Sequence, residues 1–302
     1  MKADLSRYRF QRALRPFSFP VAMIACLTGV ALAWADGAVI DGAFPERVWQ
    51  PLQILLILLG GVLAQAGVNL INDYADIHLI RRQPGPEAER IVKAIRFNFV
   101  CGMLCFLFAA LIALYLITLT GLELLLICLL GLAGALGYTL SPVNYKNRGL
   151  GVVMVFWLMG VLMISGSHLA AGGELSWQVF WQTIPVSLLV SALLLSNELR
   201  DFESDREQGL QTLTVRAGFE RGCRLYQLLL LLVWLCVGLF WFVGLLPYAW
   251  VLLPALILLI RPLGLLRTSR LERGRLPPTT ARALMGFGVL YCLALILPSF
   301  SI

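Results

Sequence analysis

Long apolar runs, each about as long as a membrane is thick, dominate this chain of 302 residues. A helix needs about 20 apolar residues to cross a hydrocarbon core of about 30 Å. Because every backbone polar group must be satisfied within such a segment, each run predicts a transmembrane α-helix. Nine runs fit: Phe17–Ala35, Val48–Ile71, Ala94–Thr118, Leu122–Leu140, Gly149–Ala171, Val179–Leu199, Leu225–Leu245, Ala249–Leu266 and Ala281–Ser299.

The composition supports an integral membrane protein. Hydrophobic residues make up 59% of the chain and charged residues only 14%, whereas soluble domains carry about 25% charged residues. We therefore expect an all-α integral membrane protein, with residues 1–302 forming a single membrane domain.

The basic residues set the expected orientation. Of the 24 Lys and Arg, all but Arg47 fall in the N-terminal arm or in even-numbered loops between the nine runs. Lys and Arg favour the cytoplasmic side of short loops, so we expect the N-terminus inside, the C-terminus outside, and the protein in the inner (cytoplasmic) membrane. The net charge of +7 then reflects topology. No basic face is long enough to neutralise several phosphates, so nucleic acid is not an expected partner.

Two polar clusters lie at the cytoplasmic ends of apolar runs. One contains Asn69, Asn72, Asp73 and Asp76, and the other places Asn197, Asp201 and Asp205 four residues apart. That spacing puts oxygen-bearing side chains on one helical face, and ionisable groups at a membrane margin are costly. Nine spans bring both clusters to the same side of the membrane.

Oxygen ligands from two helices predict a bound cation and an anionic substrate. Mg²⁺ is held by one or two carboxylates together with substrate phosphates, so we expect Mg²⁺ and a diphosphate, with an active site on the cytoplasmic side. The candidate metal ligands are Asn72, Asp73, Asp76, Asn197, Asp201 and Asp205, of which Asp76, Asp201 and Asp205 are the candidate catalytic residues. Candidates for binding the diphosphate are Asn69, Lys146, Arg148, Arg200 and Arg206. The alternative is that the acidic residues only cap helix ends and that the basic residues only set topology.

The two clusters resemble a known family. Residues 72–76 (NDYAD) and 197–205 (NELRDFESD) are similar to the two aspartate-rich motifs of the UbiA superfamily of intramembrane prenyltransferases. The segments 15–20 (RPFSFP), 145–151 (YKNRGLG) and 212–218 (TLTVRAG) resemble the 1,4-dihydroxy-2-naphthoate polyprenyltransferase branch.

This resemblance implies nine helices around a central cavity with a cytoplasmic cap. It implies Mg²⁺-dependent transfer of a polyprenyl chain from polyprenyl diphosphate to an aromatic acid, namely 1,4-dihydroxy-2-naphthoate with decarboxylation, in menaquinone biosynthesis. Prenylation of 4-hydroxybenzoate or another aromatic acceptor is the alternative. A membrane transporter is the alternative of another class, although its essential charges should lie near mid-membrane, where the nine runs carry none.

The sequence departs from the family pattern at two places. Family members usually carry an aspartate shortly after the position of Asp76, but no carboxylate occurs here before Glu87. Either Asp73 completes the first metal site, or that site holds its cation with fewer charges, or activity has drifted. Val152 also stands where naphthoate-type members commonly have an acidic residue. Both departures concern the acceptor more than the donor.

Overall fold

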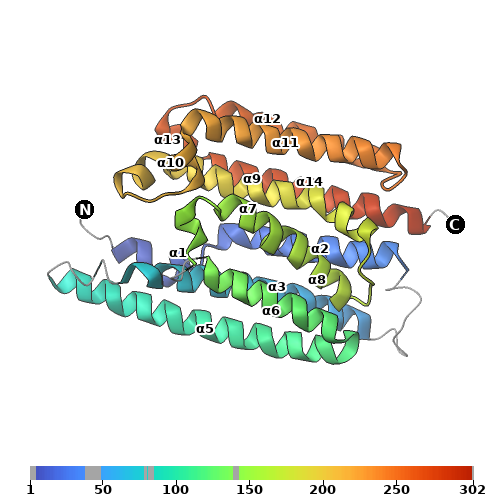
Figure 1. Cartoon of the computed structure of the whole chain (residues 1–302), viewed down its shortest axis with the longest axis horizontal. Coiled ribbons are helices and arrows are strands. Elements are labelled where there is room, and N and C mark those ends of the chain that lie inside the picture. Colours follow the sequence, from blue (N-terminus) through green and yellow to red (C-terminus); the bar gives the residue numbers. More distant parts are fainter. Residues whose placement is uncertain (1–4, 38–48, 78–79, 81–84, 139–142, 301–302) are drawn as a thin grey trace.

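The computed structural model describes residues 5–37, 49–77, 80, 85–138 and 143–300, and every regular element among them is helical (Figure 1). The longer helices are α2 (Phe19–Ala35), α3 (Trp49–Asn72), α5 (Pro86–Thr120), α6 (Leu122–Gly137), α9 (Trp177–Glu207), α11 (Phe219–Phe242), α12 (Ala255–Leu265) and α14 (Leu276–Ile296). A continuous helical rod of α7 (Gly151–Val155), the π-helical η5 (Phe156–Leu162) and α8 (Met163–Ala170) stands between α6 and α9. Short helices α1 (Phe10–Ala13), α10 (Leu213–Ala217) and α13 (Arg270–Arg273) complete the set, with 3₁₀ turns η1 (Leu5–Tyr8), η2 (Pro16–Ser18), η3 (Asp73–Asp76), η4 (Tyr145–Arg148), η6 (Ala249–Leu252) and η7 (Leu297–Phe300).

Each of the nine apolar runs corresponds to helix, but not all of these helices have the length of a span. Within the described residues, seven are long and apolar enough to cross a membrane, while α6 and α12 are apolar but shorter. A multi-pass, all-helical membrane architecture is therefore confirmed. The count of nine spans and the orientation stay predictions.

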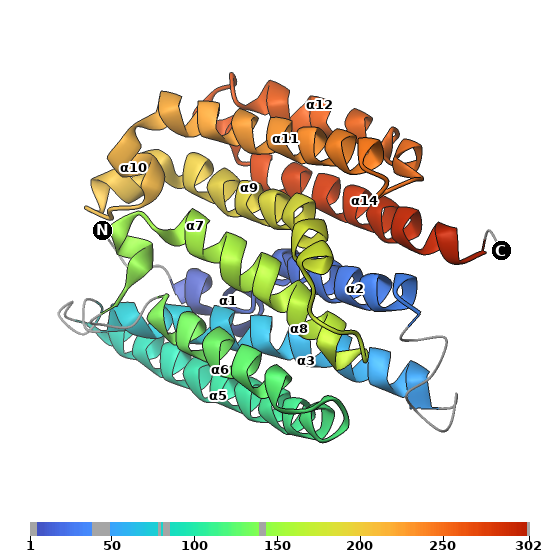
Figure 2. The ribbon, with the colours of Figure 1, turned by 45° about the vertical axis from the view of Figure 1, so that its right-hand side comes forward.

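The helices run lengthwise in two halves (Figures 1 and 2). One half contains α9, α11, α12 and α14, the other α3, α5 and α6, and α2 lies between them with the α7–α8 rod. At one end of the bundle, on the left of Figure 1, lie α1, α10 and α13, whereas α14 ends at the opposite end. The ends of α3 and α9 that carry the two polar clusters thus belong to the same end of the molecule.

Turn residues set where several helices stop. Gly121 separates α5 from α6 with φ +100°, a conformation that favours glycine. Pro86 begins α5 at the helix position where a missing N–H costs least. Ser176 caps α9, its hydroxyl oxygen accepting a hydrogen bond from the Val179 N–H at 3.2 Å. Of these, Pro86 lies at the polar end of the bundle, and Gly121 and Ser176 lie at the opposite end.

Burial differs sharply between the helices. α9 is the most buried of the candidate spans and α5 the least. Along α5 a continuous row of large apolar side chains, including Leu104, Phe108 and Leu111, faces outward. Exposed apolar surface of this extent is typical of a lipid-facing helix rather than of a soluble protein. α9, which carries the second polar cluster, is therefore enclosed by other helices along most of its length.

Candidate active site

A cavity of about 1560 Å³ joins the two polar clusters. Its polar end is lined by Asn72 and Asp73 from the first cluster and by Asn197, Asp201 and Asp205 from the second. From there it continues between apolar side chains as far as Ile57, Leu116 and Leu124, near the other end of α3, α5 and α6. A chamber with a polar end and a long apolar body suits an amphiphile with one charged end.

Arg15 occupies the first cluster. Its guanidinium lies 3.1 Å from Asp73 Oδ1, whose side chain is buried. With the Asn72 amide oriented to satisfy its neighbours, Asn72 Oδ1 accepts hydrogen bonds from Arg15 at 2.8 and 2.9 Å. Arg15 also adopts φ 49°, a left-handed conformation rare outside glycine. The turn before α2 is therefore shaped so that a guanidinium reaches the first cluster.

Asn69 holds that turn in place. Its Nδ2 donates to Leu14 O at 2.9 Å and to Ser18 Oγ at 2.8 Å, and its Oδ1 accepts from Gln65 Nε2 at 3.2 Å. The hydroxyl of Ser18 in turn donates to Arg15 O at 2.9 Å. The predicted role of Asn69 in binding diphosphate is untested, but these contacts engage both ends of its amide in presenting Arg15.

Two predicted residues have side chains outside the described structure. Asp76 closes η3, and its backbone continues the helical path of α3, but its side chain is not described. The Lys146 side chain is likewise outside the described set. Their roles therefore rest on the sequence.

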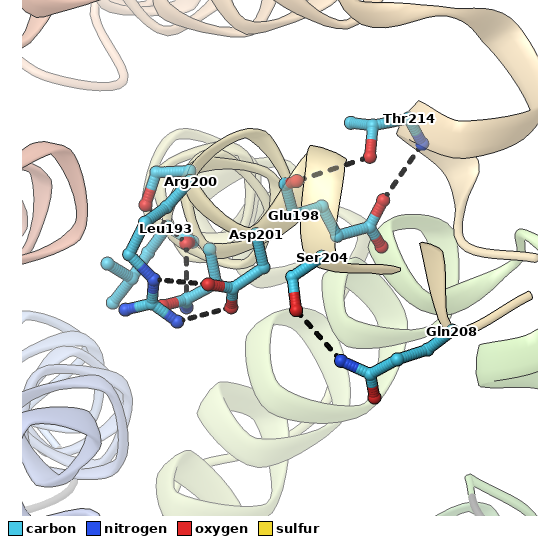
Figure 3. Close-up of polar contacts among 9 residues, drawn as sticks. Leu193, Glu198, Arg200, Asp201, Ser204, Gln208 and Thr214 are labelled. Carbon is cyan, nitrogen blue, oxygen red and sulfur yellow. Dashed lines mark hydrogen bonds and ion pairs between the residues drawn. The ribbon is translucent and has the colours of Figure 1, made fainter. Parts of the chain in front are cut away.

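The second cluster lies along the last turns of α9, and Figure 3 shows Asp201 beside Arg200. Arg200 grips Asp201 with two hydrogen bonds, Nε to Oδ1 at 2.8 Å and Nη2 to Oδ2 at 2.5 Å. Asn197 donates from Nδ2 to Leu193 O at 3.1 Å, and its buried Oδ1 has no hydrogen-bond partner among the described residues. Since a buried amide oxygen without a partner is costly, Asn197 Oδ1 is suited to coordinate a ligand.

The remaining basic candidates lie elsewhere. Arg148 and Arg206 are exposed and do not line the cavity, so the structure does not bring them to the polar end. Arg12 and Arg15 line it instead. Sequence reasoning assigned both to topology, although Arg15 belongs to a segment that already resembled the family motif.

Two further cavity residues were not singled out from sequence. Glu198 is buried and lines the cavity beside Asn197. Tyr145 also lines it and donates its hydroxyl to Gly134 O. Burial raises the pKa of Tyr145 to about 12, so its phenol stays protonated near neutral pH. Their position at the cavity depends on tertiary packing, which motif spacing does not reveal.

The donor atoms at the polar end fit Mg²⁺. Carboxylate and amide oxygens gather there with no sulfur or imidazole among the predicted ligands, and such hard oxygens suit Mg²⁺. Within the described residues, no three His, Cys, Asp or Glu side chains form a metal-binding group by themselves. Mg²⁺ does not need one, because it takes one or two carboxylates and completes its shell with water and phosphate oxygens.

Comparison with known proteins gives a consistent family. The chain matches the UbiA prenyltransferase family over residues 22–290. It is 31% identical over 241 residues to 1,4-dihydroxy-2-naphthoate octaprenyltransferase of Escherichia coli (strain K12), covering 76% of this chain and 74% of that protein. It is 29% identical over 306 residues to UbiA prenyltransferase domain-containing protein 1 of Xenopus tropicalis, covering 94% of this chain and 81% of that protein.

Solved structures show the same fold. A UbiA homolog from Archaeoglobus fulgidus bound to DMAPP and Mg²⁺ has a TM-score of 0.64 at 16% identity, covering 96% of this chain and 99% of that one. The same homolog bound to GPP and Mg²⁺ has a TM-score of 0.61 at 16% identity, covering 95% and 99% of the two chains.

Proposed function

This chain belongs to the UbiA prenyltransferase family, and from that membership we propose that it transfers a polyprenyl chain from polyprenyl diphosphate to 1,4-dihydroxy-2-naphthoate, with loss of the carboxylate as carbon dioxide. The observation that carries the proposal is the single cavity that joins both acidic motifs to a long apolar chamber. Membership makes the chain a prenyltransferase rather than a transporter. The naphthoate acceptor is supported by the name of the Escherichia coli relative.

The two regions of the cavity suit the two parts of the donor. The diphosphate belongs at the polar end, and the isoprenoid tail lies along the apolar body between α3, α5, α6 and α8. Because the tail comes from lipid and not from water, it gains binding energy from van der Waals packing against the cavity walls, away from the reacting atoms. Remote binding energy of this kind can orient the reacting end.

The acidic motifs hold Mg²⁺ and the arginines hold the phosphate. Asn72, Asp73, Asp76, Asn197, Asp201 and Asp205 are the proposed metal ligands. When bound, Mg²⁺ acts as a Lewis acid that neutralises charge on the leaving diphosphate. Arg15 and Arg200 now grip Asp73 and Asp201. Because a guanidinium binds phosphate as readily as carboxylate in a bidentate manner, we assign both to the diphosphate oxygens of the bound donor.

The proposed transfer breaks one bond of the donor, forms one bond to the acceptor and releases carbon dioxide. The bond between the allylic carbon and the diphosphate oxygen breaks, and its electron pair leaves with the diphosphate. The aromatic carbon that bears the carboxylate forms the new carbon–carbon bond. Loss of carbon dioxide then returns an electron pair to the ring. The polar end supplies positive charge from two arginines, and the apolar walls exclude water that would capture the allylic cation.

Orientation and location follow from the charge pattern. The polar end of the cavity lies at the end of the bundle that carries α1, α10 and α13. Basic residues concentrate in these segments, which supports a cytoplasmic active site in a multi-pass inner-membrane protein. The aromatic acid then enters from the cytoplasm, and the donor enters from the bilayer.

An acceptor panel tests the proposal. Purified protein with Mg²⁺ and farnesyl or longer diphosphates is offered 1,4-dihydroxy-2-naphthoate, 4-hydroxybenzoate and other aromatic acids. We expect a prenylated, decarboxylated naphthalene product that requires Mg²⁺. Turnover of 4-hydroxybenzoate in preference to the naphthoate would overturn the acceptor, and no turnover of any acceptor would overturn the prenyl transfer itself.

A further inference from the structure

Glu198 is the carboxylate of the second motif that the metal pattern leaves out. It lies on α9 directly after Asn197, outside the series Asn197, Asp201 and Asp205. Its side chain is 8% exposed and lines the cavity. A carboxylate in such surroundings needs hydrogen-bond donors, because burying a charge without partners is expensive. One hydrogen-bond partner among the described residues is Thr214.

Glu198 is bonded twice to Thr214. The Thr214 N–H donates to Glu198 Oε2 at 3.0 Å, and Thr214 Oγ1 donates to Glu198 O at 3.3 Å. Figure 3 shows the Glu198 side chain reaching toward Thr214 and away from the Arg200–Asp201 pair. Thr214 stands in the first turn of α10, where backbone N–H groups have no partner within the helix. The Glu198 carboxylate on α9 thus accepts a hydrogen bond from a backbone N–H in the first turn of α10.

α10 is packed where it stands. Thr214 is fully buried, and a Cβ added at Gly222 of α11 would lie 3.0 Å from both Thr214 Cγ2 and Leu199 Cδ2. On another side, a Cβ at Gly149 would lie 2.8 Å from Arg216 Cδ. The short helix is therefore seated between α9, α11 and the turn before α7.

The segment that leads into α10 covers the polar end of the cavity. We call residues 208–217 the cap segment. Gln208, Leu210 and Thr212 line the cavity with the metal-motif residues. The segment begins where α9 ends, and it returns to α9 through the Thr214 contacts with Glu198. The loop is thus closed by the bonds to Glu198, one turn before Asp201.

We propose that Glu198 is a positioning residue that latches the cap segment over the metal–diphosphate end of the cavity. The inference rests on the proposed function, because it assigns that end to a diphosphate. Glu198 holds the cavity-lining residues of the cap segment in place beside the second motif, and it does so without contacting the ligand itself. Loosening this latch opens the polar end and speeds escape of the diphosphate.

Three variants of the full-length protein in detergent test the latch. Glu198→Ala removes the side-chain acceptor, Glu198→Gln keeps an amide oxygen for the Thr214 N–H, and Thr214→Val removes only the hydroxyl bond. Glu207→Ala is the matched control, since Glu207 is an exposed carboxylate at the end of the same helix and does not line the cavity. The readouts are hydrogen exchange of the cap segment and the affinity for inorganic pyrophosphate with Mg²⁺.

We expect Glu198→Ala to speed exchange at Leu213 and Thr214 and to weaken pyrophosphate binding, each by about tenfold to a hundredfold. That change corresponds to about 1.4 to 2.8 kcal/mol, the range of a hydrogen bond to a charged group. Glu198→Gln should recover most of both losses, Thr214→Val should show a smaller change, and Glu207→Ala should match the wild type.

Several results would overturn the latch. Unchanged exchange of the cap segment in Glu198→Ala is one. Turnover lost equally in Glu198→Gln and Glu198→Ala, with wild-type exchange in both, is another, because it would mean a direct chemical role for the carboxylate. If Glu198→Ala does not fold, Thr214→Val decides alone, and wild-type exchange of the cap segment in that variant would refute the latch. Failure of the wild type to prenylate any acceptor would count against the proposed function and leave these binding and exchange results valid.

Discussion

Arg15 and Arg200 give the two acidic motifs a common feature. Each places a guanidinium on a carboxylate that is also a proposed metal ligand, Asp73 in one motif and Asp201 in the other. The acidic end of the cavity therefore carries its own counter-charges. When metal and diphosphate bind together, each guanidinium can pass from a carboxylate to a phosphate oxygen while the total charge stays balanced.

Asp201 and Asp205 give the sharpest test at a single residue. We expect Asp201→Asn or Asp205→Asn to lower turnover by more than the roughly 10- to 100-fold seen when a residue supporting a metal ligand is lost. Expression and helix content should stay at the wild-type level, because both side chains lie at the partly exposed end of α9. Turnover with Mg²⁺ measures the effect, and near-normal activity in both variants would remove them from the metal site.

Variants of Asp73 and Arg15 distinguish metal binding from diphosphate binding. Asp73→Asn should weaken Mn²⁺ or Mg²⁺ binding by roughly 10- to 100-fold if Asp73 completes the first site. Arg15→Gln should leave metal affinity near normal but raise KM for the diphosphate donor, since a charged hydrogen bond contributes about 1.5 to 3 kcal/mol. Metal titration and donor kinetics distinguish the two. Unaltered metal affinity in Asp73→Asn would mean that the first motif holds its cation through other residues.

At the scale of elements, α9 organises the site. It is the most buried candidate span, and its last three turns carry the second motif. Arg273 of α13 supports that end: it donates to Leu199 O at 3.2 Å, pairs with Glu203, and stacks its guanidinium 4.3 Å from the Phe219 ring centroid. The catalytic face of α9 is thus braced from its opposite face.

Close packing of η5 on α9 gives a prediction about stability. A Cβ added at Gly160 would lie 2.8 Å from Ser187 Cα, and backbone cannot move aside as a flexible side chain can. We expect Gly160→Ala to destabilise the protein by about 1–3 kcal/mol through overpacking, seen as faster thermal inactivation in detergent. Gly238→Ala is the control, because Gly238 has nothing within 4 Å of such a Cβ and alanine favours a helix by about 1 kcal/mol. Equal stability of the two variants would contradict the described packing of η5 on α9.

Hydropathy located the elements but not their ends. The run expected at Ala94–Thr118 is the core of α5, which begins earlier, at Pro86, because a helix continues into water after its apolar stretch ends. The run at Ala249–Leu266 is divided into η6 and α12, and Pro254 stands between them. Apolar content measures membrane affinity, whereas proline and capping residues decide where a helix starts.

For the molecule as a whole, sequence reasoning predicted only part of the cavity that joins the two motifs. Helical spacing and charge topology placed Asn72, Asp73, Asn197, Asp201 and Asp205 at one end, and the cavity contains them together. The spacing did not reveal Arg15 or Glu198. Arg15 reaches the cavity through a left-handed turn, and the place of Glu198 depends on the packing of α10 against α9. Arg148, which the sequence places at the end of a predicted cytoplasmic loop, is exposed and does not line the cavity.

The orientation in the membrane is testable with two exposed leucines at opposite ends of the bundle. Leu271 on α13 is 92% exposed at the polar end, and Leu175, 49% exposed, lies in the connection before α9 at the other end. In cells whose outer membrane has been permeabilised, a membrane-impermeant thiol reagent should label Leu175→Cys directly. It should label Leu271→Cys only after the inner membrane has been permeabilised as well. The reverse pattern would place the polar end of the cavity outside and contradict the charge-based orientation.

The proposed function requires both acidic motifs to hold one metal–diphosphate unit together. An experimental structure of the protein with Mn²⁺ in place of Mg²⁺ and a non-hydrolysable geranyl thiodiphosphate tests it most directly, because the anomalous signal of Mn²⁺ locates the ions. We expect Mn²⁺ at the polar end of the cavity, contacted by side chains of both the Asn72–Asp76 and the Asn197–Asp205 segments, with the diphosphate between them. Metal and diphosphate bound to one motif alone, or outside this cavity, would contradict a shared site.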